Sequence, residues 1–195
     1  MAAELCKDRT KNDLDDALRQ LLEHKPLDQI RIRELTALCG IRRQSFYYHF
    51  PDVWALFDWS LKQEEQRLLI RQETCLTWKQ VLVDLLNHTA RHRKYYQALL
   101  ESRGRAGLRE IMREPLRSLL DKTLDYYQRR CGTAKNSPAD YALLSCWETL
   151  LLTLLESWIQ EDLLQSPQEL LAFLETIVQM ETADIAWRNL FSQNS

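Results

Sequence analysis

Apolar residues recur at helical spacing along almost the whole chain. In the first stripe they occupy positions i, i+3, i+4, i+7 and i+8, which are Leu14, Ala17, Leu18, Leu21 and Leu22. This spacing places the apolar side chains on one face of a helix. The 195 residues contain only 4 Gly and 5 Pro, which leaves little material for the many turns of an all-β fold. The sequence therefore predicts an all-α fold.

Turn residues divide the stripes into two groups. Two short helices are expected within residues 32–50, and a longer fourth helix is expected after Pro51. We expect residues 1–60 to form a three-helix head, with the fourth helix as its connector. Residues 61–195 carry the remaining stripes and are expected to form a helical bundle.

Signals for helix ends inside the bundle are local. Gly104 loosens the chain, and Pro115 is expected in the first turn of the next helix, where its missing N–H costs nothing. Ser137 and Ser166 are each followed by a proline. Ser166 is also followed by Glu169 at the spacing of a capping box. Both serines are predicted to start long helices.

The segment IRELTALCGIRRQSFYYHF, residues 32–50, predicts a helix-turn-helix. Its first helix is expected to end at Gly40, because glycine tolerates the left-handed backbone at such a stop. Its second helix is expected to span about residues 42–49. The apolar side chains that would anchor this helix are Ile41, Phe46 and Phe50.

Positive charge is concentrated in this segment. The whole chain has a net charge of −2, so the protein is not a uniformly basic nucleic-acid binder. Residues 29–50 carry +3, whereas residues 8–28 carry −2 and residues 101–195 carry −4. The basic residues of the segment are Arg31, Arg33, Arg42 and Arg43. A phosphate backbone requires positive charge on the surface that meets it.

The second short helix carries side chains that can contact DNA. In a helix-turn-helix its N-terminal end touches base edges, where Arg can grip guanine and Gln can grip adenine. Aromatic hydroxyls and an imidazole can contact sugar and phosphate. The candidate residues are Arg42, Arg43, Gln44, Ser45, Tyr47, Tyr48 and His49. A helix–glycine–helix segment with arginines also occurs in all-α proteins of other functions, so the residues alone leave both interpretations open.

The same segment resembles the DNA-binding domain of the tetracycline-repressor (TetR/AcrR) family. The similarity lies in a GI turn followed by FYYHF and covers about residues 8–60. The rest of the chain resembles the family's ligand-binding and dimerising domain in helix pattern. Residues 92–100, 158–159 and 166–170 are similar to the branch of the family that includes dihydroxyacetone-kinase regulators.

This resemblance assigns roles to individual residues. It implies base or groove contacts for Arg33, Arg43, Gln44 and Ser45, and phosphate contacts for Tyr47, Tyr48 and His49. The chain departs from the family at Val53, where a phosphate-binding lysine is common, and at Arg31, where a threonine cap is frequent. Arg31 is a candidate replacement for the missing phosphate contact.

The resemblance also implies a function. It implies a homodimer joined through residues 138–161 and 167–182, which binds a near-palindromic double-stranded DNA operator. A small-molecule effector in the bundle would tilt the connector helix and make the protein a ligand-responsive repressor. The alternative is a small-molecule-sensing or partner-binding helical regulator of the co-activator type that does not bind DNA on its own. Val53 and the acidic total charge favour this alternative.

The sequence gives weaker evidence for a ligand pocket, a metal site or a catalytic site. The aromatic candidates for a ligand pocket are Trp78, Tyr95, Tyr96 and Trp147, and each could equally be ordinary core. His88 and His92 have a spacing that can bind metal, but no carboxylate or cysteine joins them locally. We expect them on a solvated face or at the edge of a ligand pocket, with no metal and no cofactor. The sequence shows no catalytic motif, so we expect no enzyme.

The cysteines and the apolar segments indicate the cellular compartment. The 5 cysteines are odd in number and scattered, which fits free thiols in a reducing cytosol. No apolar run follows Met1, and no stretch approaches the ~20 apolar residues of a membrane span. We therefore expect a cytoplasmic protein without a membrane partner.

Overall fold

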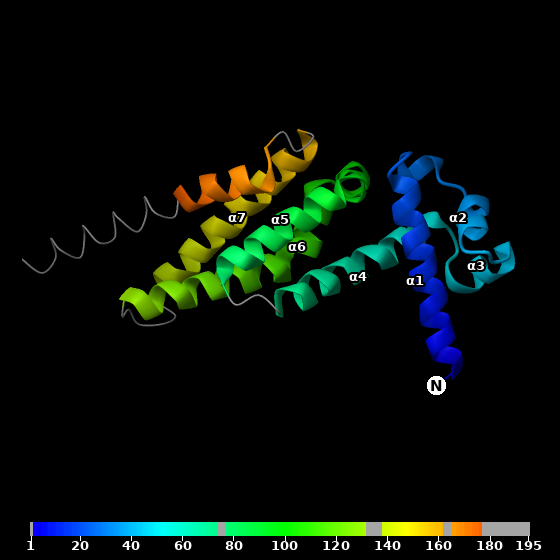
Figure 1. Cartoon of the computed structure of the whole chain (residues 1–195), viewed down its shortest axis with the longest axis horizontal. Helices are drawn as coiled ribbons and strands as arrows, with labels where there is room; N and C mark the ends of the chain where they lie inside the picture. The colour runs from blue at the N-terminus through cyan, green and yellow to red at the C-terminus, as the bar shows by residue number, and fades with distance from the viewer. Residues whose placement is uncertain (1, 74–76, 132–137, 162–164, 177–195) are drawn as a thin grey trace, which may run out of the picture.

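Helices make up all the regular structure in the described part of the chain, which confirms the predicted all-α class. The computed structural model describes residues 2–73, 77–131, 138–161 and 165–176. Helices α1 to α3 form a head at one end of the molecule, and α5 to α7 form a bundle at the other (Figure 1). Helix α4 runs between the two.

The head consists of α1 (Ala2–Leu22), a short 3-10 turn (Leu27–Gln29), α2 (Ile32–Leu38) and α3 (Arg43–His49). Its core is closed by side chains without solvent exposure, including Leu14, Leu18, Leu35 and Phe46. These are the apolar positions of the sequence stripes, and α1 packs against α2 while α2 packs against α3. The head therefore folds around the faces that the periodicity predicts.

The turn between α2 and α3 depends on Gly40. Its φ of +64° lies in the left-handed region that L side chains rarely adopt. The next amide, the N–H of Ile41, donates to the carbonyl oxygen of Thr36 at 3.0 Å. This hydrogen bond closes the end of α2 and redirects the chain into α3.

Helix α4 (Val53–Glu73) connects the head to the bundle. The Asp52 carboxylate accepts a hydrogen bond from the Ala55 N–H at 2.8 Å and so caps the start of the helix. The polar spacing of residues 66–77 predicts a break or a helix junction, and α4 ends within this range at Glu73, before α5 begins at Trp78. Up to that end the helix is continuous, and Leu68 and Gln72 are buried. It packs against α1 of the head and against α5 and α6 of the bundle.

The bundle contains α5 (Trp78–Arg91), α6 (Arg93–Cys131) and α7 (Pro138–Gln160). Helix α6 is kinked at Gly104, whose φ of 61° and ψ of −162° are not helical. The prediction that Pro115 lies in a first turn is wrong. The helix resumes directly after Gly104, because a buried stripe from Leu108 through Met112 leads into Pro115.

Helix α7 packs mainly on α6. Its buried side chains are Leu151, Leu152, Leu155, Trp158 and Ile159, whereas small polar residues occupy the exposed side. Residues 167–176 form a further helix. The capping box at its start is confirmed, since Glu169 N–H donates to Ser166 Oγ at 3.2 Å and Ser166 N–H donates to Glu169 Oε2 at 2.7 Å. Ser137 lies outside the described residues.

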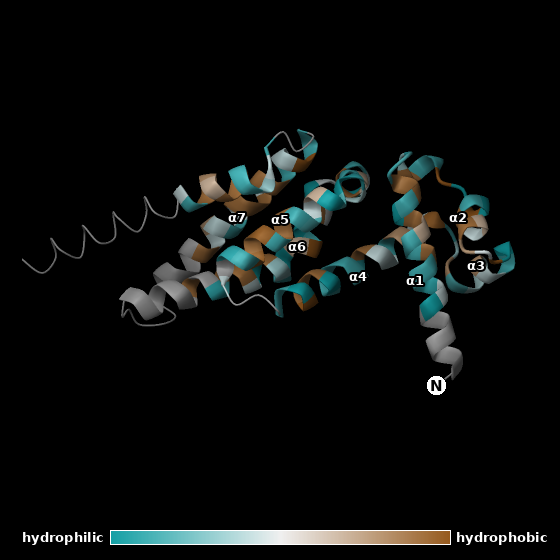
Figure 2. Cartoon of the chain, in the orientation of Figure 1, coloured by the Kyte–Doolittle hydropathy of each residue, from teal (hydrophilic) through white to brown (hydrophobic). Residues whose placement is uncertain are grey.

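Apolar residues gather where the bundle helices meet, as Figure 2 shows by colour on α5, α6 and α7. Across the residues that the structure covers, no helix combines the length and apolar character that crossing a bilayer requires.

Candidate nucleic-acid interface

Helix α3 buries one face and exposes the rest. Phe46 is 0% exposed and Phe50 is 5% exposed, so these rings attach α3 to the head core. Between and before them the helix presents polar side chains to solvent, namely Arg43, Gln44, Ser45, Tyr47 and Tyr48. Tyr47 and Tyr48 are 57% and 66% exposed. Neighbouring exposed rings of this size make α3 a candidate contact surface.

The arginines of the segment are exposed to solvent. Arg31 and Arg33 flank the start of α2, and Arg42 and Arg43 flank the start of α3. Within the described residues, no ion pair involves any of these four side chains. The nearby acid, Glu34, instead accepts from Lys25 Nζ at 2.6 Å and from the Arg31 backbone N–H at 3.0 Å. These hydrogen bonds lower the pKa of Glu34.

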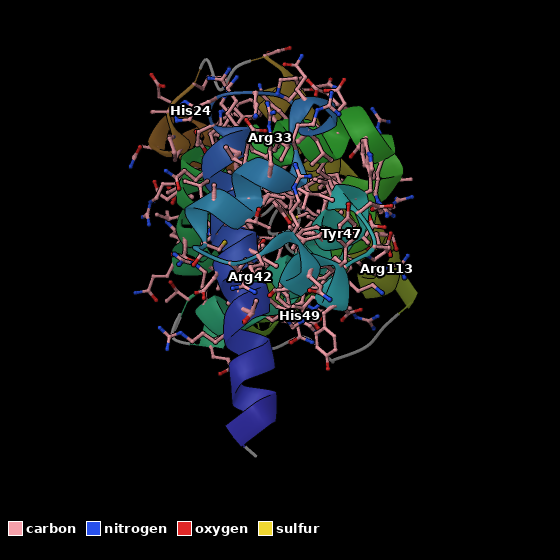
Figure 3. The ribbon with its side chains drawn as sticks, turned by 90° about the vertical axis from the view of Figure 1, so that its right-hand side faces the viewer. His24, Arg33, Arg42, Tyr47, His49 and Arg113 are labelled. Carbon is pink, nitrogen blue, oxygen red and sulfur yellow. The ribbon has the colours of Figure 1, made fainter. Side chains whose placement is uncertain are left out.

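A shallow open hollow of about 470 Å³ lies between α1 and α3. Its lining combines Thr10 of α1 with the turn and α3 residues Ile41, Arg42, Gln44, Ser45, Tyr48 and His49. Figure 3 views the molecule from the head end and shows Arg33, Arg42, Tyr47 and His49 on the head. The sequence did not identify Thr10, because it belongs to another helix and nothing local relates it to α3.

The candidate ligand-pocket residues occupy different places. Tyr95 and Tyr96 are buried near the start of α6, with ring centroids 5.7 Å apart. Their hydroxyls have partners, because Tyr95 bonds Ser60 at 2.9 Å and Tyr96 donates to Glu64 at 2.7 Å. Trp147 is half-buried on α7. Trp78 begins α5, and its side chain lies outside the described residues.

A buried polar cluster joins the head to the bundle, and sequence reasoning missed it. Asp15 of α1 and Ser60 and Glu64 of α4 are each 0% exposed. Arg19 of α1 donates to Glu64 Oε2 at 2.8 Å and to Asp15 at 3.3 Å, and Ser60 Oγ donates to Asp15. Burial alone would raise the pKa of Glu64, but the hydrogen bond from His88 and the charge of Arg19 lower it to about 2. Glu64 is therefore a buried carboxylate that stays ionised.

The expectation that His88 lies on a solvated face is wrong. His88 is 6% exposed, and its Nε2 lies 2.5 Å from Glu64 Oε1. Because a carboxylate only accepts hydrogen bonds, Nε2 must carry the proton. His92, half-buried at the end of α5, packs its ring 4.5 Å from that of His88. In the described part of the chain, no cluster of His, Cys, Asp or Glu could hold a metal ion.

These features define a helix-turn-helix protein with a helical bundle as its second domain. The family model TetR_C_8, described as "Transcriptional regulator C-terminal region", matches residues 76–180. The chain belongs to the TetR family of transcriptional regulators.

Two solved structures extend the likeness over both domains. A structure titled "Dihydroxyacetone kinase operon activator DhaS" has a TM-score of 0.72 and 17% identity, covering 88% of this chain and 95% of the other. A putative TetR-family transcriptional regulator from Rhodococcus sp. has a TM-score of 0.61 and 14% identity, covering 88% and 98%. At these identities the likeness is one of fold. No curated protein matches the sequence significantly.

Proposed function

We propose that this protein is a DNA-binding regulator that acts as a homodimer on a near-palindromic operator and represses transcription until an effector binds. Residues 1–60 form the DNA-binding head and residues 61–195 the effector-binding and dimerising domain. The observation that carries the proposal is the set of exposed arginines at α2 and α3, which form no ion pair within the described residues, together with the buried rings of Phe46 and Phe50, which attach α3 to the head core.

Each candidate side chain of residues 31–49 has a role in this proposal. Base or groove contacts fall to Arg33, Arg42, Arg43, Gln44 and Ser45, and backbone contacts fall to Arg31, Tyr47, Tyr48 and His49. The hollow between α1 and α3 supports a shared contact surface, because its lining includes polar side chains from both ends of α3. Groove contacts supply sequence preference, whereas backbone contacts fix the register of the head on the duplex.

Dimerisation is assigned to α7 and to residues 167–182, of which 177–182 lie outside the described residues. The exposed side of α7 carries small side chains that allow a second helix to approach closely, namely Ser145, Cys146, Thr149, Thr153 and Ser157. Phe173, on the next helix, is 51% exposed. A symmetric dimer would place two α3 helices ~34 Å apart, one turn of DNA.

The effector is assigned to the bundle, with Trp78, Tyr95, Tyr96 and Trp147 as candidate contacts. A regulator of this kind acts in the cytoplasm. By tilting α4, a bound effector would alter the spacing of the two heads and so couple effector binding to operator binding.

The test is a double substitution at the head. Arg43→Ala with Tyr47→Ala removes one proposed base contact and one backbone contact, and operator affinity should fall about 100-fold. Arg113→Ala is the matched control, because Arg113 is an exposed arginine on α6 (Figure 3). Affinity measured by fluorescence anisotropy on the DNA upstream of the protein's own operon should separate the two. Full affinity in the double variant contradicts the proposal.

The alternative function is that of a partner-binding regulator that does not bind DNA on its own. Val53, 9% exposed at the start of α4, favours it, because it buries the position where a phosphate-binding lysine is common in the family. This function predicts no shift of upstream DNA by the purified protein and a shift once a partner protein is added. A reporter gene under the same upstream DNA gives the sign of regulation.

A further inference from the structure

The two carboxylate oxygens of Glu64 face different domains. Oε2 accepts a hydrogen bond from Arg19 Nη2 of the head at 2.8 Å. Oε1 accepts from Tyr96 OH of α6 at 2.7 Å and from His88 Nε2 of α5 at 2.5 Å. One buried side chain on the connector helix thus holds the head on one oxygen and the bundle on the other.

The head side of this contact is held at several points. Arg19 lies over the Tyr95 ring, with its guanidinium carbon 4.0 Å from the ring centroid. Arg67 of α4 reaches Asp15 of α1 at 2.7 Å. Asp15 and Glu64 carry two negative charges, and Arg19 and Arg67 carry two positive ones, so the cluster is balanced. Head and bundle therefore meet in a largely buried polar contact in which each acid has an arginine partner.

Such a contact has few intermediate states. A buried carboxylate that loses its donors is left with an uncompensated charge, which is strongly unfavourable. The cluster is satisfied when α1, α4, α5 and α6 hold their present positions, and it loses several partners together when the head turns on α4. An element with two discrete arrangements is what coupling between distant sites requires.

We propose that Glu64 is a positioning residue that fixes the orientation of the DNA-binding head on the bundle, and that release of its hydrogen bonds from His88 and Tyr96 is the step by which the bundle changes operator binding. This inference rests on the proposed function for its consequence at the operator. The latch itself (Glu64 with Arg19, His88 and Tyr96) is defined by contacts within one chain.

The chain offers a matched control for this latch. Asp58 of α4 pairs with Arg103 of α6, which also links the connector to the bundle. That pair is exposed, with side-chain exposures of 46% and 40%, and it includes no residue of the head. Asp58→Asn removes this ion pair between α4 and α6 without touching the latch.

Hydrogen exchange on the full-length protein without DNA tests the latch directly. Tyr96→Phe keeps the ring and removes one bundle-side donor to Glu64. Amides of α1 at residues 14–22 should then exchange roughly tenfold faster, because losing a hydrogen bond to a buried charge raises the population of the released head. Asp58→Asn should leave α1 unchanged. Faster exchange confined to α5 and α6 in Tyr96→Phe overturns the proposal.

Operators with altered half-site spacing test the consequence. The wild type should prefer one spacing about tenfold over spacings one base pair shorter or longer, and Tyr96→Phe should reduce this preference to about threefold. Asp58→Asn should keep it. An equal loss of affinity at every spacing indicates a merely structural role and overturns the proposal. If the wild type binds no operator specifically, the proposed function fails. The exchange measurement then still tests whether the latch holds the head on the bundle.

Discussion

Arg19 and Glu64 lie 45 positions apart in the sequence, yet the guanidinium Nη2 of one is 2.8 Å from the carboxylate Oε2 of the other. Their side chains are 12% and 0% exposed. This pair joins the first helix of the head to the connector helix inside the protein, where solvent screens it little. The orientation of the head therefore depends on a buried ion pair as well as on the chain that links the head to the bundle.

Arg19→Met should destabilise the protein strongly. The substitution leaves Glu64 and Asp15 buried with fewer donors, and breaking a buried pair in this way costs about 3–5 kcal/mol. The free energy of unfolding from urea titration measures the effect. Arg103→Met is the control, since its ion pair with Asp58 is exposed and should be worth at most about 1 kcal/mol. Equal losses in the two variants would contradict the buried assignment.

Acid should destabilise the fold in two steps. Burial, and then the neighbouring His88, lower the pKa of His92 to about 4 from its ordinary value of 6.5. Between pH 6.5 and 4 the unfolded chain therefore binds more protons than the folded one. The contribution of His92 to the free energy of unfolding is fully present above pH 6.5 and is lost as the pH falls to 4. Glu64, with its pKa lowered to about 2 from 4.5, adds a second loss between pH 4.5 and 2.

The first step can be assigned by substitution. His92→Gln should flatten the unfolding free energy between pH 6.5 and 4, because it removes the group that titrates there. His24→Gln, at an exposed histidine, should retain the wild-type slope. Urea titrations at half-unit pH intervals give the curves. A His92→Gln variant with the wild-type slope would show that another group is responsible.

The head is the part that the sequence predicts well, because its determinants are local. Leu14 and Leu18 follow one stripe, Gly40 marks the turn, and the 3.6-residue period places Phe46 and Phe50 inside and Tyr47 and Tyr48 outside. Each of these assignments needs only neighbours within one or two helical turns. The exposure of the candidate DNA-contacting residues was therefore predictable, although their contacts with DNA stay a prediction.

The junction between head and bundle could not be predicted in this way. Asp15, Arg19 and Glu64 are charged, and a charged residue counts as exposed unless its partner is known. Arg19 of α1 and Glu64 of α4 are partners from helices far apart in the sequence. His88 of α5, another partner of Glu64, was expected in solvent or at a pocket edge. The one local signal was the i, i+4 spacing of Asp15 and Arg19 beside the Leu14–Leu18 stripe.

Phe46→Ala should weaken the head without removing any of the side chains proposed to contact DNA. The ring is 0% exposed, and truncating a buried phenylalanine costs roughly 3–5 kcal/mol. Urea denaturation should show this loss. Tyr48→Ala, at a 66% exposed ring on the same helix, should change stability by less than about 0.5 kcal/mol while lowering operator affinity. A stability loss at Tyr48 equal to that at Phe46 would contradict the orientation of α3.

Gly40→Ala should destabilise the turn through backbone strain alone. A Cβ at this position meets nothing within 4 Å, but φ is +64°. An L side chain in that region costs about 1–2 kcal/mol. Gly40→Asn should cost less, because asparagine enters the left-handed region more readily. Thermal unfolding of the two variants provides the comparison, and an alanine variant as stable as wild type would show that the turn adapts.

The salt dependence of operator binding is the most direct test of a DNA-binding head. A dimer that binds 6–10 phosphates should lose roughly 10³–10⁵-fold in affinity between 50 and 200 mM salt, because each neutralised phosphate releases a counterion. Arg31→Ala removes one proposed phosphate-binding side chain from each protomer, so the slope of log affinity against log salt should fall by about 2 in a symmetric dimer. Affinity for the upstream DNA of its own operon that falls this steeply supports the account. A flat response to salt, or no binding at all, would contradict it.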